Sequence, residues 1–249
     1  MVNDTLLSAL EFRTLVSLLT GLIPPDLPQL CDGCGAANDK NHALKCNNGG
    51  LMISSHDGVN VELQSQARLA QKASDVYDEP RTQPGRAART PMDNPSQDES
   101  QAATPHERKG DTLIRDFWRN GRDCIIDVRM VNCDADSYWQ KDHQKVLARC
   151  ERDKKRKHLA DCLEQRRDFT PFVASREAIF AKEAETLLKC LAAKLSRKWK
   201  RHYSEICGYV KACMGLALIR STTRCLYGSR IPACLISRQP EWCNKAEMG

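Results

Sequence analysis

Residues 111–131 read DTLIRDFWRNGRDCIIDVRMV, and this stretch decides the predicted fold. Two apolar pieces flank Asn120-Gly121, a dipeptide that favours a tight turn between antiparallel strands. The second piece, from Cys124 to Val131, is continuous enough in apolar residues to be a central strand. The stretch therefore predicts a β-hairpin in the middle of a sheet.

The segments on either side of this hairpin predict an α/β domain. Helical spacing of apolar residues and stop signals predict helices over 6–22, 56–73 (capped by Ser55), 141–167, 177–201 and 203–220, and extended pieces over 76–79 and 169–174. After the first helix, the order is helix, three strands, helix, strand and further helices. This order, αβββαβ at its core, is typical of an α/β (α+β) fold with a small mixed sheet.

One segment does not fit into that domain. Residues 81–110 contain four Pro and no Val, Ile, Leu or aromatic residue. Such a segment cannot bury enough apolar surface to offset the entropy lost on ordering, so it is predicted to be a disordered insertion.

The overall composition limits the class of protein. The chain has 249 residues, of which 41% are apolar, but it has no run of about 20 apolar residues that could span a bilayer. The apolar stretch over 15–23 lacks a basic leader and a small-residue cleavage site, so secretion is not expected. Most of the 13 cysteines fall in apolar patterns, which favours a reducing compartment, nuclear or cytoplasmic. We expect no membrane partner.

The positive charge is concentrated in two predicted helices. Residues 1–80 carry five Lys or Arg against ten Asp or Glu, whereas residues 141–167 carry ten against five and residues 182–201 carry seven against two. Clusters of this kind attract polyanions such as nucleic acid. Charge alone equally fits a solvated helix surface with interspersed Glu and Lys.

The segment CDGCGAANDKNHALKCNNGG, residues 31–50, has the spacing of a metal site. Cys31 and Cys34 form a C-x2-C pair, and His42 and Cys46 follow at H-x3-C spacing. Four soft ligands of these types form a closed tetrahedral zinc site without an open position for catalysis. We predict a structural zinc that stabilises a segment too small for its own core. The alternative is three unrelated thiols and a surface histidine.

Two aspartates occupy special places in the hairpin. Asp111 opens the first strand and Asp127 interrupts the most apolar strand, where a carboxylate is costly to bury without a partner. A hairpin can bring both carboxylates to one end of the sheet, where they could hold Mg²⁺. Glu62 on the preceding helix could add a third oxygen ligand, with Glu79 as a competitor. The alternative is a turn residue and a structural acid paired with a cation.

The stretch from Asp111 to Asp127 resembles the PD-(D/E)XK motif of restriction-endonuclease-like nucleases, whose core has the same αβββαβ order. Lys109-Gly-Asp111 resembles the first triplet and Asp127-Val-Arg129 resembles the second. A zinc cluster directly before such a nuclease resembles the C-terminal region of non-LTR retrotransposon polyproteins. Strings such as SHDGVNVEL, DFWRNGRDCIIDVR and LEQRRDFTPFVAS carry this resemblance, which covers residues 5–232.

The chain departs from the nuclease pattern at two motif positions. Gly110 replaces a proline, a change expected to alter only the stiffness of the turn, and Arg129 replaces the motif lysine, although arginine cannot act as a base. In some members of the superfamily the lysine lies on the following helix. Lys154, Lys155 and Lys157 lie on that helix here. The resemblance implies Lys157 or a neighbour beside the scissile phosphate.

The resemblance also implies a domain plan. We predict an N-terminal helical segment (1–28), a zinc knuckle (29–52), a restriction-endonuclease-like domain (53–176), a helical extension (177–232) and a tail (233–249).

The leading functional hypothesis is a metal-dependent DNA endonuclease that nicks DNA, without a reverse transcriptase, since the chain has no adjacent Asp-Asp pair. RNA is a further candidate binding partner besides DNA. The alternatives are a catalytically decayed nucleic-acid-binding remnant and a cysteine-rich helical scaffold for another protein.

Overall fold

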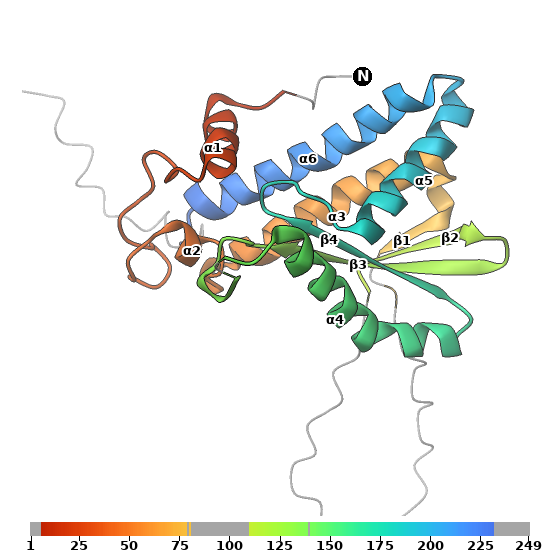
Figure 1. The fold of residues 1–249 in the computed structure, drawn as a ribbon, viewed down its shortest axis with the longest axis horizontal. Helices are drawn as coiled ribbons and strands as arrows, with labels where there is room; N and C mark the ends of the chain where they lie inside the picture. The colour runs from red at the N-terminus through yellow and green to blue at the C-terminus, as the bar shows by residue number, and fades with distance from the viewer. Residues whose placement is uncertain (1–5, 79, 81–109, 139, 232–249) are drawn as a thin grey trace, which may run out of the picture.

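The computed structural model of the chain describes residues 6–78, 80, 110–138 and 140–231. The predicted insertion up to residue 109, Glu79 and the tail after residue 231 lie outside the described residues. Within the described part, four strands form one mixed sheet and six α-helices accompany it, of which α1 and α2 lie at one end of the molecule next to α6 (Figure 1). The α/β class and the order helix, three strands, helix, strand are confirmed.

The sheet is built on the predicted hairpin. Its strands β1 (Val76–Asp78), β2 (Thr112–Arg119), β3 (Arg122–Val131) and β4 (Asp168–Ser175) lie in the order β1-β2-β3-β4. The first three strands are antiparallel and β4 runs parallel to β3. Arg119 pairs with Arg122, so Asn120-Gly121 is the predicted two-residue turn, in which Gly121 adopts the positive φ that glycine allows.

The helices are α1 (Ala9–Thr20), α2 (Lys40–Ala43), α3 (Leu51–Ala70), α4 (His143–Glu164), α5 (Lys182–Trp199) and α6 (Tyr203–Tyr227). Three predicted helix boundaries were wrong. Helix α5 begins at Lys182 and not at residue 177. Helix α3 begins at Leu51, after the positive-φ turn at Gly49-Gly50, and Ser55 lies buried inside it instead of capping it. Helix α6 continues to Tyr227, because its last turns pack against the N-terminal segment.

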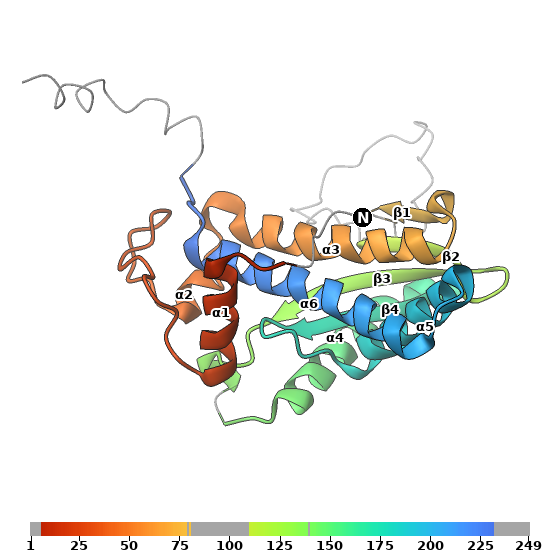
Figure 2. The ribbon, with the colours of Figure 1, turned by 90° about the horizontal axis from the view of Figure 1, so that it is seen from above.

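The helices cover the two faces of the sheet unequally (Figures 1 and 2). Helices α3, α5 and α6 pack on one face, and α4 packs on the other. Because side chains alternate along β3, Ile126 and Val128 join the larger core, whereas Ile125 and Val131 pack under α4. Asp127 therefore lies on the α4 face, with 5% of its surface exposed. Each fully buried Ile or Leu contributes about 1.5 to 3 kcal/mol.

The residue before Asp111 does more than set the stiffness of the turn, which corrects the sequence-based expectation. Gly110 is buried, and a Cβ atom there would clash with the side chain of Ile125. Its N–H also donates a hydrogen bond of 2.8 Å to the carbonyl of Pro80. Proline has neither the space nor the donor at this position, so glycine is needed here for close packing.

Two further observations concern the described residues only. None of their helices is both long and apolar enough to cross a membrane. Their cysteines are all unpaired thiols, and Cys150 and Cys162 are buried as small apolar side chains.

Candidate metal centre and carboxylate site

The four predicted zinc ligands lie together. The Sγ atoms of Cys31 and Cys46 are 3.8 Å apart, those of Cys34 and Cys46 are 4.0 Å apart, and Cys34 Sγ is 3.3 Å from His42 Nε2. All four ligand atoms lie within 4.8 Å of one another. Zinc–sulfur bonds of about 2.3 Å at tetrahedral angles place sulfur atoms about 3.8 Å apart. The donor set and its spacing therefore fit a tetrahedral zinc ion.

Local backbone structure presents these ligands. The Cys31 amide donates to the Ala36 carbonyl and the Gly35 amide donates to the Cys31 carbonyl, which closes the first knuckle. Asp39 caps the short helix α2 by accepting from the His42 amide at 2.6 Å. Burial raises the pKa of the Cys31 thiol, but hydrogen bonds from His42 and from two knuckle amides outweigh burial and lower it to about 6. A thiolate, the form that binds metal, is thereby favoured.

The metal cluster is anchored to the end of α6. Arg230 is buried, and its Nη2 donates to the carbonyls of Ala43 and Cys225 at 2.9 and 2.8 Å. Asp32, inside the knuckle, accepts from the Arg230 amide at 2.9 Å. A Cβ atom at Gly33 would lie only 2.8 Å from the Arg230 Cβ, so this position needs glycine for the close approach. The knuckle and the α6 terminus therefore form one packed unit.

The two predicted carboxylates meet at the start of β2. The Asp111 amide donates to the Ile126 carbonyl at 2.9 Å, and Asp111 Oδ2 accepts from the Val128 amide at 2.6 Å. Asp111 is thus bonded to both chain neighbours of Asp127. Burial raises the pKa of Asp127 to about 6, Lys154 opposes this shift, and the adjacent Asp111 carboxylate adds to it. The structure therefore brings the two predicted acids together.

Helix α4 contributes a cation to the acid pair. Lys154 Nζ donates to Asp127 Oδ1 at 2.9 Å and lies 2.8 Å from Oδ2. One turn later, His158 Nε2 lies 3.3 Å from Asp127 Oδ2, and its ring stacks on Phe169 with centroids 5.5 Å apart. The i, i+4 spacing of Lys154 and His158 puts both side chains on the helix face that covers β3.

Helix α3 contributes a polar stripe on the other side of Asp111. His56 Nε2 lies 3.1 Å from Asp111 Oδ2, and Asn60 Nδ2 donates to the Asp111 carbonyl at 3.3 Å. Gln64 Nε2 donates to the Asp78 carboxylate at 2.8 Å. Together these side chains line an open pocket of about 360 Å³. Three aspartates, Asp57, Asp78 and Asp111, line this pocket and offer their carboxylates to a ligand.

Two predicted catalytic residues are placed elsewhere. Glu62 lies on a different face of α3 from the polar stripe, where it accepts from Gln66 at 2.6 Å and faces Cys213 on α6. Lys157 lies on an exposed face of α4. Lys155 pairs with Glu183 at 2.8 Å. Of the three lysines considered from the sequence, Lys154 is the one that contacts the acid pair.

The sequence-based reasoning missed His56, Asn60, Gln64 and Asp78. The signal was present, since three hydrogen-bonding residues at i, i+4 and i+8 mark one face of a helix. That face runs beside the predicted apolar stripe of Val59, Leu63 and Ala67, all of which are buried. A polar stripe next to a buried one is typical of a helix edge that borders a site.

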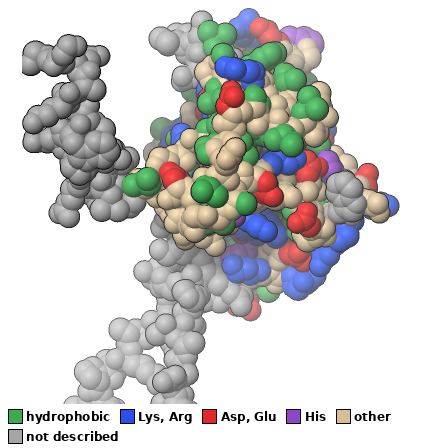
Figure 3. All heavy atoms as spheres, turned by 90° about the vertical axis from the view of Figure 1, so that its left-hand side faces the viewer, with side chains coloured by type: hydrophobic (Ala, Val, Ile, Leu, Met, Phe, Trp, Pro, Cys, Tyr) green, Lys and Arg blue, Asp and Glu red, His purple; other side chains and the backbone are tan. Residues whose placement is uncertain are grey.

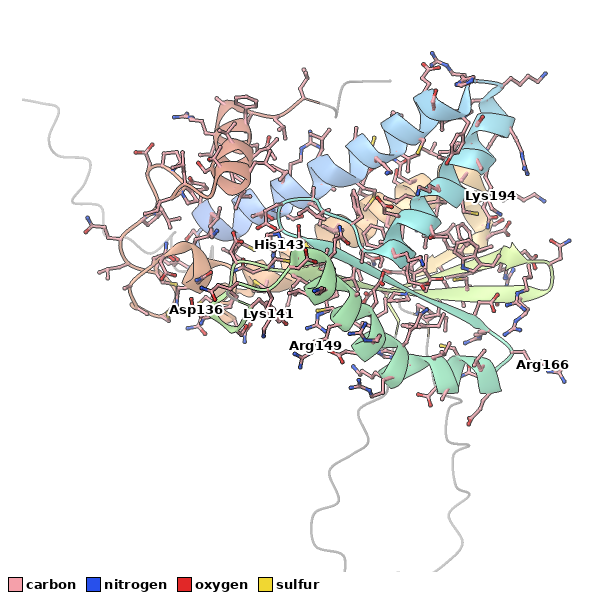
Figure 4. All side chains as sticks on the ribbon, in the orientation of Figure 1. Asp136, Lys141, His143, Arg149, Arg166 and Lys194 are labelled. Atoms are coloured by element: carbon pink, nitrogen blue, oxygen red, sulfur yellow. The ribbon has the colours of Figure 1, made fainter. Side chains whose placement is uncertain are left out.

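A row of cations extends the α4 side of the site. Lys141, Lys145, Arg149 and Arg152 line a shallow pocket of about 400 Å³ together with Tyr138. Figure 4 shows Lys141 and Arg149 at the first half of α4, and Figure 3 shows Lys and Arg side chains gathered on this lower edge of the molecule. Among the described residues, Lys145, Arg149 and Arg152 have no carboxylate within ion-pair distance. This row is available to a polyanion.

The His56–Asp111 pair predicts a pH-dependent stability. The bond to Asp111 raises the pKa of His56 to about 9 from 6.5, against the opposing effect of burial. Because the folded-state pKa is raised, the stabilisation is complete below pH 6.5 and is lost as the pH rises through 9. We expect the pair to contribute about 1 to 2 kcal/mol to the free energy of unfolding. This is less than the full pKa shift implies, because the His56 side chain is one-third exposed and solvent screens the pair.

His56→Gln keeps a donor for Asp111 but does not titrate, so its unfolding free energy should vary less between pH 6 and pH 9.5 than that of the wild type. Urea unfolding measured across this range checks the difference. The matched control is the exposed His202→Gln, which should follow the wild-type curve. Parallel curves for wild type and His56→Gln would contradict the assignment.

The chain was compared with protein families and with curated proteins. No protein-family model matches the chain, and no curated protein matches it.

Proposed function

We propose that the chain is a metal-dependent DNA endonuclease that nicks one strand, with Asp111 and Asp127 as the ligands of Mg²⁺. The observation that supports this most is the convergence of two acids from adjacent strands with Lys154 from the following helix. The αβββαβ order is that of restriction-endonuclease-like nucleases, which the two motif triplets resemble. A bound Mg²⁺ would activate water and neutralise charge on the scissile phosphate.

The other residues of the site and of the metal cluster have distinct roles in this proposal. Lys154, next to Asp127, replaces Lys157 in our proposal as the cation that stabilises the charged phosphate. His56 donates to Asp111 and holds that carboxylate in place. The Cys31, Cys34, His42 and Cys46 cluster would hold a structural zinc that fixes the knuckle against α6. The reduced thiols of this cluster fit a nuclear or cytoplasmic location.

A second candidate is a nucleic-acid-binding protein without catalysis. Its specific support is that both acids already have cationic partners, since His56 faces Asp111 and Lys154 faces Asp127. These two pairs are neutral overall, whereas a magnesium site needs uncompensated negative charge. Arg129 in place of the motif lysine also favours this candidate. A nicking assay on supercoiled plasmid with Mg²⁺ or Mn²⁺ separates the two functions.

Both candidates share a prediction about DNA binding along α4. Neutralising Lys145, Arg149 and Arg152 by Gln should weaken binding and lower the slope of log affinity against log salt by about 2.7, because each phosphate contact releases counterions. Fluorescence anisotropy of a labelled duplex at several salt concentrations measures both quantities.

The control for this experiment is a triple Gln variant at Lys189 and Arg197 of α5 and Lys200, the residue that follows the helix. It removes the same formal charge from the opposite side of the sheet. Its salt slope should stay near the wild-type value. If both triple variants lose the same slope, only the net charge matters and α4 is not the DNA-binding surface.

A further inference from the structure

A third pocket shares His56 with the open pocket that is lined by Asp78 and Asp111. It has a volume of about 320 Å³, and Met52 and Ile53 of α3 and Val128 of β3 form its apolar walls. Arg129, Arg176 and His56 are residues of the same pocket lining. None of its lining residues carries a carboxylate. We refer to it as the arginine pocket.

The arginine pocket exists because the pairing of β2 with β3 stops short. The last paired residues are Thr112 and Ile126, so beyond Ile126 the edge of β3 is not covered by β2. Asp111 Oδ2 accepts the Val128 amide at this edge. Strand geometry directs the Met130 amide to the same edge, two residues further on. The uncovered edge thus adds a backbone donor to the cationic side chains.

Arg176 is the most unusual residue in this pocket. It is among the largest fully buried side chains, and no carboxylate among the described residues forms an ion pair with it. Its Nη1 donates to Ser55 Oγ at 2.9 Å, and its other neighbours are the sulfur atoms of Met52, Met130 and Cys225 at 3.6 to 3.8 Å. Its Nε has no hydrogen-bond partner.

A buried guanidinium among neutral partners is costly. Moving an ion of this size out of water costs several kcal/mol in real proteins unless a counterion compensates. Neutral sulfur and hydroxyl groups compensate little, and burial accordingly lowers the pKa of Arg176. Arg129, half-buried on the neighbouring strand, also forms no ion pair within the described residues. Among the described residues, neither arginine has a carboxylate within ion-pair distance, and the only carboxylate that opposes the effect of burial on the pKa of Arg176 is that of the more distant Glu177.

We propose that the arginine pocket binds a phosphate group of the nucleic-acid backbone, next to the phosphate held at the acid pair. The proposal rests on the proposed function. His56 lines both pockets, so one nucleic-acid strand could contact both of them. Planar guanidinium groups match the geometry of phosphate oxygens and bind them by paired hydrogen bonds. The assignment also gives Arg129 a role at the motif position where lysine is expected: it binds phosphate and does not act as a base.

The test uses the full chain without added divalent cations, so that binding is read independently of cleavage. Inorganic phosphate is titrated into the protein by calorimetry, and a short single-stranded oligonucleotide is then used as a competitor. Ile53 is 69% exposed at the pocket wall, so Ile53→Glu adds a negative charge there without disturbing Arg176. Ile53→Gln is the matched neutral control. Arg129→Gln removes one cation from the pocket.

We expect phosphate to bind the wild type and Ile53→Gln alike, and to bind Ile53→Glu and Arg129→Gln at least tenfold more weakly. The oligonucleotide should displace phosphate. Absence of phosphate binding to the wild type, or equal binding to Ile53→Glu, would overturn the site. Phosphate binding without displacement would assign the pocket to a free phosphate and overturn the nucleic-acid part. If the oligonucleotide displaces phosphate but the protein does not nick plasmid DNA, the result would support the phosphate site and count against the endonuclease.

Discussion

Asp127→Asn is expected to abolish Mg²⁺-dependent nicking of supercoiled DNA and to leave the chain folded. The variant keeps the size of the side chain and an oxygen that can accept from Lys154, but it removes the negative charge that a divalent cation needs. Loss of a metal ligand removes several kcal/mol of transition-state stabilisation, which corresponds to a rate loss of about a thousandfold or more. The conversion of supercoiled to open-circular plasmid measures this rate.

Stability and DNA binding should respond differently from activity in this variant. Burial raises the pKa of Asp127 to about 6, so the folded state binds a proton more readily than the unfolded state does. The ionised carboxylate therefore costs stability as the pH rises from about 4 through 6, and Asn avoids that cost. At pH 7 we expect thermal unfolding to change little and duplex affinity to stay the same or rise slightly.

The control is Asp153→Asn, which makes the same chemical change on α4 at a residue paired with Arg156. It should nick at the wild-type rate. Activity retained by Asp127→Asn would remove Asp127 from the metal site. A wild type that binds DNA but never nicks would favour the non-catalytic protein, and Arg129→Lys would then show whether the motif lysine restores cleavage.

The hairpin and the metal cluster were predictable because their signals are local. Asn120-Gly121 predicts the turn, and a hairpin brings the outer ends of its two strands to one edge, so the two acids could be expected near each other. Their exact pairing was not predictable, because the register of β2 against β3 shifts between Ile114 and Arg119. The ligands at positions 31, 34, 42 and 46 lie within sixteen residues, and short spacing of this kind constrains geometry by itself. Both predictions depended on the chain near each residue and not on the packing of distant elements.

The side chains that the helices contribute to the site were not predictable, because their positions depend on the packing of elements that are distant in sequence. Which lysine of α4 reaches Asp127 depends on how that helix is rotated against the sheet, and three nearby lysines differ only by that rotation. The rotation is set by Val146, Leu147 and Cys150, which pack against β3 and β4. Glu62 was misplaced similarly, since the rotation of α3 turns it toward α6. Arg176 gives no sequence signal, because its burial depends on α3, β3 and α6 together.

Cys34→Ser is expected to release the zinc ion and to loosen two segments that are distant in sequence. The wild type should hold one zinc per chain, since structural sites of this type bind zinc with apparent free energies of about 10 to 16 kcal/mol. Cys34 is the exposed ligand, so serine at this position removes a thiolate without leaving a cavity in the core. Zinc content after dialysis against a weak chelator measures the loss.

Hydrogen exchange then distinguishes a metal site from a simple packing role. Residues 28–50 should lose protection, and residues 225–231 should lose it with them, because Arg230 bonds Ala43 and Asp32 of the knuckle. Strands β2 and β3 should stay protected, since their core does not include the knuckle. Cys207→Ser, a thiol change outside the cluster, should keep both zinc and protection. Stoichiometric zinc in Cys34→Ser would rule out this ligand set, because three ligands and a hydroxyl bind zinc far more weakly than four soft ligands do.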